Sequence, residues 1–369
     1  MSFLEKLLGG ADVEWRALES IAKIKHGKDW KGLDEGNVPV YGSGGIMGYV
    51  DTYSYNKPTV LIPRKGSITN VFFVDEPFWN VDTIYYTDIN TQIIVPKYLY
   101  YFIKTIDLLS LDTGSGRPSL TQAILNKIQV PIPCPDNPKK SLEIQTEIVQ
   151  ILDAFSAITA ELTAELIARK KQYNYYRDQL LSFKDETLEW KKLGEVAEIG
   201  TGSHDTQDAI EDGNYIFYAR GRETLKLNVF DFDETAIITA GDGAGVGKVF
   251  HYAQGKYALH QRAYRIAPKE IMDPRFVYHC IASYFYTYIQ KASVSSSVTS
   301  LRRPMFLNFP IPCPPLIEQI RIANLLDKFD VLCNSITEGL PREIELRQQQ
   351  YEYYRDLLFS FPQSEEVEV

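Results

Sequence analysis

The sequence lacks the long apolar runs by which membrane proteins are recognised. Across its 369 residues, no apolar stretch approaches the ~18 residues that a membrane-spanning helix needs. Residues 1–10 contain no basic region followed by a long apolar core, so we expect no secretion signal. Cysteine is scarce: there are 4, and their spacing matches no metal site. We therefore expect reduced, mostly packed thiols in a cytoplasmic protein.

Patterns typical of catalytic and nucleotide-binding sites are missing as well. The glycine-rich segment Gly241–Lys248 lacks the glycine spacing of the dinucleotide fingerprint, and Val249 stands where a P-loop has Ser or Thr. We expect a hairpin loop with positive φ at several positions. Asp136–Lys139 lacks the second proline and the aromatic residue of an adenine-methyltransferase motif. These absences predict a non-catalytic protein with no metal site.

The sequence also lacks the excess of basic residues that would point directly to nucleic acid. It contains 39 Lys and Arg against 48 Asp and Glu, a formal net charge of −9. Much of the acidic excess lies in residues 315–369, so the rest of the chain is close to neutral and has room for local basic faces. Composition therefore neither supports nor excludes DNA binding.

What the sequence does contain is a duplication. Three segments occur twice: the opening Glu14-Trp15 and Glu189-Trp190, the proline-rich boundary Val130–Pro135 and Phe309–Pro314, which contains an Ile-Pro-Cys-Pro turn, and the helix end Tyr173–Phe183 and Tyr351–Phe361. The repeat unit spans about half the chain, far more than the ~20–50 residues of a solenoid repeat. The duplication predicts an internal repeat with approximate two-fold symmetry, suited to a target that also has two halves.

Each copy ends in a helical segment with an a/d seam. Apolar residues between about 141 and 183 alternate steps of three and four, which calls for a partner helix. The second seam is interrupted near Gly339 and Pro341, where we expect a kinked or broken helix. We predict that the two helices form an antiparallel coiled coil; the alternative is two unrelated helices, each packed on its own domain. The predicted seam is Ile148, Leu152, Phe155, Leu162, Leu166, Tyr173, Tyr176 and Leu180 in the first helix, with Ile322, Leu326, Phe329, Ile336, Leu340, Tyr351, Tyr354 and Leu358 in the second.

The expected fold class is α+β, with two similar mixed α/β domains joined by the two long helices. The predicted domains are 1–138 and 185–314 (globular), 139–184 and 315–364 (helical), and 365–369 (an acidic tail). The predicted strands include 59–62, 71–74, 83–86, 215–218, 236–239 and 248–252, and the predicted globular helices are 96–106 and 274–289. The middles of the two halves differ, which suggests one scaffold carrying two recognition surfaces.

Together these segments resemble the DNA specificity subunit of type I restriction–modification systems. Further similarity to its target-recognition domains lies in Pro39–Ile46, Pro63–Gly66, Gly243–Val249, Gln261–Arg265 and Ser300–Arg303. The resemblance covers nearly the whole chain. It implies that each globular domain reads one half of a bipartite double-stranded DNA sequence, and that the helices form a spacer that recruits two DNA adenine methyltransferase subunits. Motor-nuclease restriction subunits would join them; S-adenosylmethionine, ATP and Mg would be bound by these partners and not by this chain.

Candidate DNA contacts are polar and cationic residues on projecting loops, since base edges and phosphates are read by such side chains. The candidates are Lys25, His26, Lys28, Ser43, Arg64, Lys65, Asn70 and Arg117 in the first half, and His204, Arg220, Arg222, Lys248, Gln261, Arg262, Arg302 and Arg303 in the second. For each, the alternative is an ordinary solvated surface residue. Arg265 is equally compatible with an internal ion pair.

Two other functions stay open at this point. One is a duplicated coiled-coil adaptor that binds proteins and no DNA, which the neutral halves and the acidic last helix would fit. The other is an enzyme with an unfamiliar site. The divergence of the loops between shared segments favours a recognition protein over the adaptor.

Overall fold

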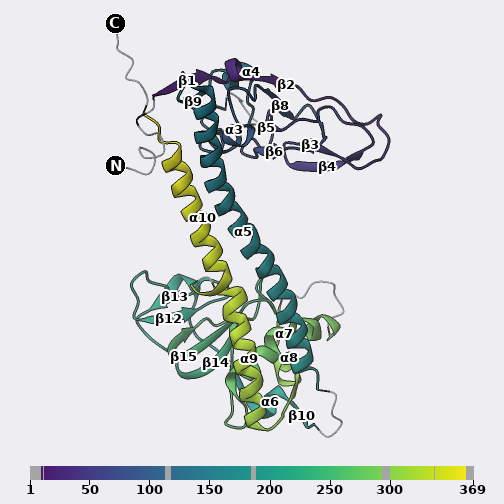
Figure 1. Ribbon diagram of the computed structural model, residues 1–369. Helices are drawn as coiled ribbons and strands as arrows, with labels where there is room; N and C mark the ends of the chain where they lie inside the picture. Colours follow the sequence, from purple (N-terminus) through teal and green to yellow (C-terminus); the bar gives the residue numbers. More distant parts are fainter. Residues whose placement is uncertain are drawn as a thin grey trace. The chain divides into compact units, whose positions relative to one another are not determined.

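The computed structural model describes residues 10, 12–112, 118–183, 188–292, 300–335 and 337–362 (Figure 1). The chain forms two compact units: unit 1 comprises residues 1–163 and 343–369, and unit 2 comprises residues 164–342. Each unit holds one mixed α/β domain and parts of the long helical segments. The predicted α+β fold with an internal repeat is confirmed. The units differ from the predicted domains because the helices are shared between them.

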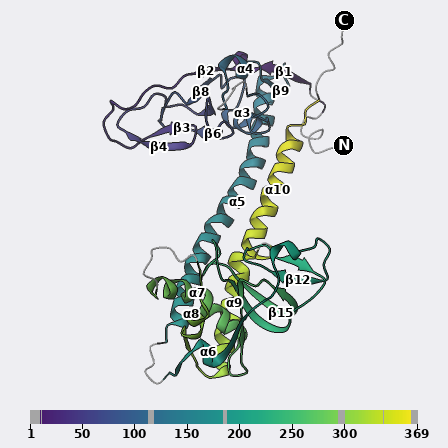
Figure 2. The ribbon, with the colours of Figure 1, turned by 180° about the vertical axis from the view of Figure 1, so that it is seen from behind.

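The domain of unit 1 is built from short strands and small helices. Its elements are β1 (Val13–Ala17), α2 (Leu18–Ile21), β2 (Ala22–Lys25), β3 (Val38–Gly42), β4 (Gly45–Val50), β5 (Thr59–Pro63), β6 (Phe72–Val74), β7 (Trp79–Asn80), β8 (Ile84–Ile89), α3 (Pro96–Ile103), α4 (Gln122–Asn126) and β9 (Gln129–Pro133). The sheets have the orders β2-β8-β5-β6, β4-β3-β7 and β1-β9 (Figure 2). Strand β5 is buried at every position because it is made of β-branched and apolar residues and lies inside its sheet.

The pairing of β8 brings several strand ends together in unit 1. Lys25 at the end of β2 pairs with Tyr86, while Pro63 at the end of β5 pairs with Ile84. Both neighbours run antiparallel to β8, so their last residues lie beside its beginning. The loops that follow β2 and β5 therefore meet at one edge of the domain.

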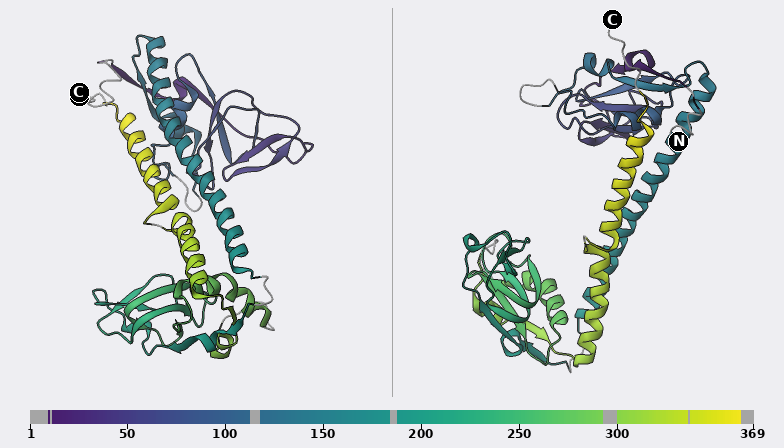
Figure 3. Two further views of the ribbon diagram at one scale, coloured as in Figure 1. Left: turned by 60° about the horizontal axis from the view of Figure 1, so that its bottom comes forward. Right: turned by 90° about the vertical axis from the view of Figure 1, so that its left-hand side faces the viewer.

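The domain of unit 2 has one larger sheet. Its elements are β10 (Trp190–Lys192), α6 (Leu193–Val196), β11 (Ala197–Thr201), η1 (Thr206–Asp208), β12 (Tyr215–Tyr218), β13 (Leu225–Leu227), β14 (Phe232–Ala240), β15 (Phe250–Leu259), β16 (Ala263–Pro268), α7 (Pro274–Ala292), α8 (Arg303–Leu307), β17 (Pro310–Pro312) and α9 (Leu316–Asn334). The six-stranded sheet has the order β11-β16-β14-β15-β12-β13. Helix α7 contacts both this sheet and α9 (Figure 3). Its apolar face, with Phe276, Ile281 and Phe285, is fully buried between them.

The long helices pair within each unit. Helix α5 (Pro138–Leu181) runs antiparallel to α10 (Gly339–Leu358) in unit 1 and to α9 in unit 2 (Figures 1 and 2). The ring of Phe155 stacks on Tyr354 with centroids 5.2 Å apart, and Tyr176 stacks on Phe329 at 5.8 Å. In the part of the seam that the structure describes, Ile148, Leu152, Ile322, Leu326, Tyr351 and Leu358 are buried, Phe155, Leu162, Leu166, Tyr173, Leu180, Phe329 and Leu340 are half-buried, and Tyr176 and Tyr354 are exposed. Ile336 lies outside the described residues.

The expected break in the second helical segment is confirmed. Helix α9 ends at Asn334 and α10 begins at Gly339, which has a φ of 74°. A Cβ atom at this position would lie 2.4 Å from the carbonyl oxygen of Val331. Only glycine combines this conformation with so close an approach to the preceding helix.

The structure confirms the position of most predicted elements and corrects one. Residues 59–62, 71–74, 83–86, 215–218, 236–239 and 248–252 each overlap a strand, and the two globular helices begin at the predicted prolines. The interpretation of Ile132–Pro135 and Ile311–Pro314 as turns is wrong for their first two residues, which belong to β9 and β17.

Prolines are compatible with β9 because they occupy only alternate positions. The N–H of Cys134 donates to Asp12 O and the N–H of Leu18 donates to Ile128 O, both at 2.8 Å. The hydrogen-bonded positions of this segment therefore alternate with Pro131 and Pro133, whose missing N–H groups face away from β1. The chain turns only at Cys134, with a φ of 50°.

Candidate nucleic-acid interface

Seven of the candidates lie around the edge of unit 1 at which β2 and β5 end. The N–H of Arg64 donates to Thr83 O at 2.9 Å, and the N–H of Ser43 donates to Thr83 Oγ1 at 3.2 Å. Asn70 Nδ2 donates to Ser43 O at 3.1 Å, which ties the β3–β4 turn to the segment after β5. Lys25, His26, Lys28 and Lys65 are exposed, whereas Ser43, Arg64 and Asn70 are half-buried. Arg117 lies outside the described residues.

The cationic side chains of this edge make only weak interactions with other residues of the protein. Lys65 Nζ lies 2.8 Å from Asp82 Oδ2, and about half of each side chain is exposed. The hydrogen bond from Lys65 lowers the pKa of the Asp82 carboxyl. An exposed pair of this kind contributes only about 0–1 kcal/mol, so Lys65 is able to exchange Asp82 for a phosphate at little cost. His26 packs edge-on against Tyr85, with ring centroids 5.0 Å apart.

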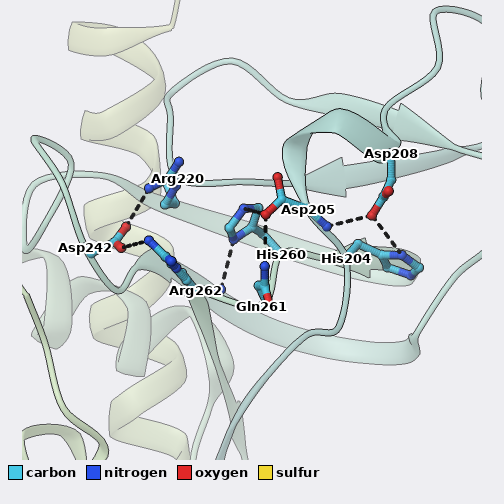
Figure 4. A network of polar contacts seen from close by, with 8 residues as sticks. All are labelled: His204, Asp205, Asp208, Arg220, Asp242, His260, Gln261 and Arg262. Atoms are coloured by element: carbon cyan, nitrogen blue, oxygen red, sulfur yellow. Dashed lines mark hydrogen bonds and ion pairs between the residues drawn. The ribbon is translucent and has the colours of Figure 1, made fainter.

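The candidates of unit 2 include two arginines that converge on one aspartate (Figure 4). Asp242 accepts hydrogen bonds from Arg220 Nη1 at 2.9 Å and from Arg262 Nη1 at 3.1 Å. These bonds, the Arg220 bond most of all, lower the pKa of Asp242. The backbone holds the group together, since the N–H of Gly241 donates to Arg262 O at 2.8 Å. The shared carboxylate fixes two guanidinium groups side by side.

The next residue along this surface is Gln261, which lies in the three-residue loop between β15 and β16. Its Nε2 donates to Asp205 Oδ2 at 2.9 Å (Figure 4). The preceding His260 is only 1% exposed, and its Nδ1 accepts the N–H of Arg262 at 2.9 Å. Burial lowers the pKa of His260, so its ring is neutral at pH 7 and carries its proton on Nε2.

A hollow of about 450 Å³ lies beside the arginine pair. Arg220, Arg222, Lys248 and Asp242 contribute its polar lining, and the loop Gly243–Gly245 contributes backbone. The glycine-rich loop joins the antiparallel strands β14 and β15, and it has positive φ at Gly243 and Gly247. The predicted hairpin loop is confirmed. Three cations around a concave surface favour an anionic ligand.

The other candidates of unit 2 are placed less favourably for direct contact with DNA. His204 Nε2 lies 3.2 Å from Asp231 Oδ1, and its carbonyl oxygen accepts the N–H of Gln261 at 2.9 Å, so it supports the Gln261 loop. Arg302 and Arg303 are exposed at the start of α8. They lie near the arginine pair because the N–H of Leu301 donates to Gly241 O at 2.7 Å.

Four residues of the network in Figure 4 were not among the candidates: Asp205, Asp208, Asp242 and His260. Acidic and buried residues are not typical DNA contacts. Their role in orienting a neighbouring side chain is seen only once the structure shows which side chain they contact. Arg265, in contrast, is confirmed as an internal partner, with Nη1 2.9 Å from Glu234 Oε1.

The described residues give no sign of other kinds of site. Within these ranges, no group of three or more His, Cys, Asp or Glu side chains is arranged to hold a metal ion. In the same part of the chain, no helix combines the length and the apolar character needed to cross a membrane.

The fold agrees with comparisons to known proteins. The chain belongs to the type I restriction modification DNA specificity domain family, whose model matches residues 11–170 and again 185–346. The EcoR124I/EcoR124II specificity subunit of a type I restriction enzyme from Escherichia coli is 41% identical over 405 aligned residues, covering 100% of this chain and 99% of the relative. A putative type I specificity subunit from Haemophilus influenzae, S.HindORF215P, is 32% identical and covers 98% of both chains.

Solved structures show the same fold. The S subunit of the type I restriction–modification system from M. genitalium superposes with a TM-score of 0.65 at 16% identity, covering 96% of this chain and 97% of that one. A chain from a structure of type I restriction–modification complex assembly has a TM-score of 0.59 at 12% identity, covering 94% and 97%.

The chain is therefore a DNA specificity subunit of the type I class, a non-catalytic component of its system. The resemblance seen in the sequence is confirmed, and the adaptor without DNA binding is not favoured.

Proposed function

We propose that the chain reads a two-part DNA sequence, with one half-site contacted by the polar edge of unit 1 and the other by the arginine–glutamine surface of unit 2. The observation that carries the proposal is that a repeated scaffold bears two different polar groups. Unit 1 presents Ser43, Lys65 and Asn70 around Thr83, whereas unit 2 presents Arg262 and Gln261 held by Asp242 and Asp205. Different donor patterns on equivalent domains favour two different base sequences.

Within each surface the residues suit different tasks. The exposed Lys25, Lys28 and Lys65 of unit 1 are point charges suited to phosphates. In unit 2, the planar guanidinium of Arg262 suits the two acceptors of guanine, and Gln261 suits adenine. Arg222 and Lys248 line the hollow beside them and would position the backbone.

The helices supply surfaces for protein partners. Tyr175 on α5 and Tyr353 on α10 are repeat equivalents, and they are 62% and 65% exposed. Large exposed aromatic side chains are typical of protein interfaces. Two equivalent exposed faces support docking of two DNA adenine methyltransferase subunits, and motor-nuclease subunits would join that assembly. These partners would carry S-adenosylmethionine, ATP and Mg and would act with this chain on DNA in the cytoplasm.

The adenine methylome of cells with and without the gene tests the proposal. We expect a two-part methylated motif that disappears on deletion and returns with the gene. Replacing residues 13–138 with the corresponding half of a relative should change one part of the motif and leave the other intact. A motif that survives deletion, or two parts that change together, would contradict the proposal.

A further inference from the structure

The orientation of the Gln261 amide is determined by its neighbour. An ionised carboxylate only accepts hydrogen bonds. The ordinary pKa of an aspartate, 3.8, leaves the carboxyl of Asp205 ionised at pH 7 whichever way the amide points. The group that faces Asp205 Oδ2 at 2.9 Å must therefore be the Nε2 amino group of Gln261. The opposite rotation of the amide would bring two oxygens together. The carboxylate thus selects one of the two amide orientations.

Both residues are held by their backbones, so this orientation is built into the domain. The N–H of Gln261 donates to His204 O at 2.9 Å. The N–H of Asp205 donates to Asp208 Oδ2 at 2.7 Å (Figure 4). The buried His260 adds a second constraint. Its Nε2 has no hydrogen-bond partner among the described residues and lies 3.9 Å from Asp205 Oδ2. The proton on Nε2 therefore favours an ionised carboxylate at position 205 over a neutral group.

The exposed edge of Gln261 then has a defined pattern. One Nε2 hydrogen is used by Asp205, which leaves Oε1 and the second hydrogen for another partner, and no described residue donates to Oε1. In the major groove, adenine offers an acceptor at N7 and a donor at N6, whereas guanine offers acceptors at both N7 and O6. The oriented amide matches adenine and places Oε1 against O6 of guanine.

We propose that Gln261 reads an adenine in the half-site of unit 2, and that Asp205 is the positioning residue that strengthens its discrimination against guanine. The inference rests on the proposed function, because it names one base contact of the same surface. Asparagine at position 205 would still accept hydrogen bonds and would still cap the short helix η1. Its amide group would, however, also be able to donate a hydrogen bond to Oε1 of Gln261. Gln261 would then be free to rotate and donate one hydrogen bond from its amino group to O6 of guanine, although Oε1 would still find no donor at N7.

The test uses the full chain, assembled with its adenine methyltransferase subunits, and a pool of DNA duplexes varied at each position of the preferred target. Bound duplexes are sequenced for the wild type, Asp205→Asn and the control Asp233→Asn. Asp233 is an exposed residue of β14, and its replacement changes the net charge by the same amount. We expect Asp205→Asn to reduce the preference for adenine over guanine at one position by roughly 5-fold, the lower end of the worth of one bidentate base contact, because the rotated amide gains a single hydrogen bond with guanine.

A second variant tests whether Gln261 is the residue that contacts the base. Glutamate only accepts hydrogen bonds and therefore matches the N4 amino group of cytosine. The double variant Asp205→Asn with Gln261→Glu should change the preference at the same position from adenine to cytosine.

Unchanged base preferences in Asp205→Asn, or the same relaxation in Asp233→Asn, would overturn the inference while leaving the proposed function intact. A wild-type complex that selects no two-part sequence would instead contradict the proposed function itself.

Discussion

His279 on α7 donates to Asp327 on α9 across 2.6 Å, and Tyr101 on α3 donates to Asp153 on α5 across 2.6 Å at the equivalent place in unit 1. A cation completes each group, since Arg275 Nε lies 2.9 Å from Asp327 Oδ1 and Lys97 Nζ lies 2.8 Å from Asp153 Oδ2. The duplication has thus preserved the attachment of each globular domain to its helix while the side chains changed.

This attachment predicts an acid-sensitive unit 2. Burial alone would raise the pKa of Asp327, but hydrogen bonds from His279 and Arg275 lower it to about 2, below its ordinary value of 3.8. The stabilisation is therefore complete above pH 3.8 and is lost as the pH falls toward 2. Asp327→Asn should lower the free energy of unfolding at pH 7 by about 1–3 kcal/mol, because it leaves a half-buried Arg275 poorly paired.

Urea unfolding followed by circular dichroism at several pH values measures this effect. Asp153→Asn is the matched control. Its pair with Lys97 is more exposed, with side chains 37% and 38% accessible against 30% and 26% for Asp327 and Arg275, so the loss should be smaller. Equal losses in the two variants would contradict this explanation.

The proposed phosphate contact of Lys65 predicts a salt-dependent effect without a change of sequence preference. Lys65→Ala should weaken binding to every DNA sequence alike and reduce the slope of log K against log salt by about one. Fluorescence anisotropy over a salt series measures it. Lys57→Ala, which removes an exposed lysine elsewhere in the same domain, should leave the slope unchanged. An altered base preference in Lys65→Ala would instead identify Lys65 as a base contact.

The two exposed tyrosines predict the number of methyltransferase subunits. We expect the purified chain alone to methylate no DNA but to bind two methyltransferase subunits. Tyr175→Ala and Tyr353→Ala should each weaken one of the two sites, so that sizing with light scattering shows complexes with one subunit. Tyr53→Ala, which removes a tyrosine that is 51% exposed outside the helices, should leave two. Full occupancy in both helix variants would show that the partners dock elsewhere.

The length of α5 predicts the gap between half-sites. Its 44 residues correspond to about 66 Å at ~1.5 Å per residue, and DNA advances ~3.4 Å per base pair. Inserting four residues after Ala164 adds about one helical turn and should lengthen the non-specific gap by one or two base pairs. The methylome of the insertion variant measures this change, with the two half-site sequences as the internal control. An unchanged gap in an active complex would mean that the helices do not set the spacing.

The sequence by itself determined the features that depend on neighbours along the chain. The seam of α5 follows from apolar residues at steps of three and four, and the break before α10 follows from Gly339 and Pro341, which act on their own turn of helix. The loop at Gly241–Lys248 was predictable for the same reason, because glycine acts through its own φ.

Only the tertiary structure decided which polar groups meet. Asp205 and Gln261 are 56 positions apart, and their contact depends on how the loop before β12 folds over the loop between β15 and β16. Similarly, the strand conformation of Gln129–Pro133 depends on its register with β1, since the prolines fit only where no N–H is required. Local sequence patterns predict which face of a helix or strand is apolar, but they do not predict strand register or loop packing. Register and loop packing are what bring side chains that are distant in the sequence within hydrogen-bond distance.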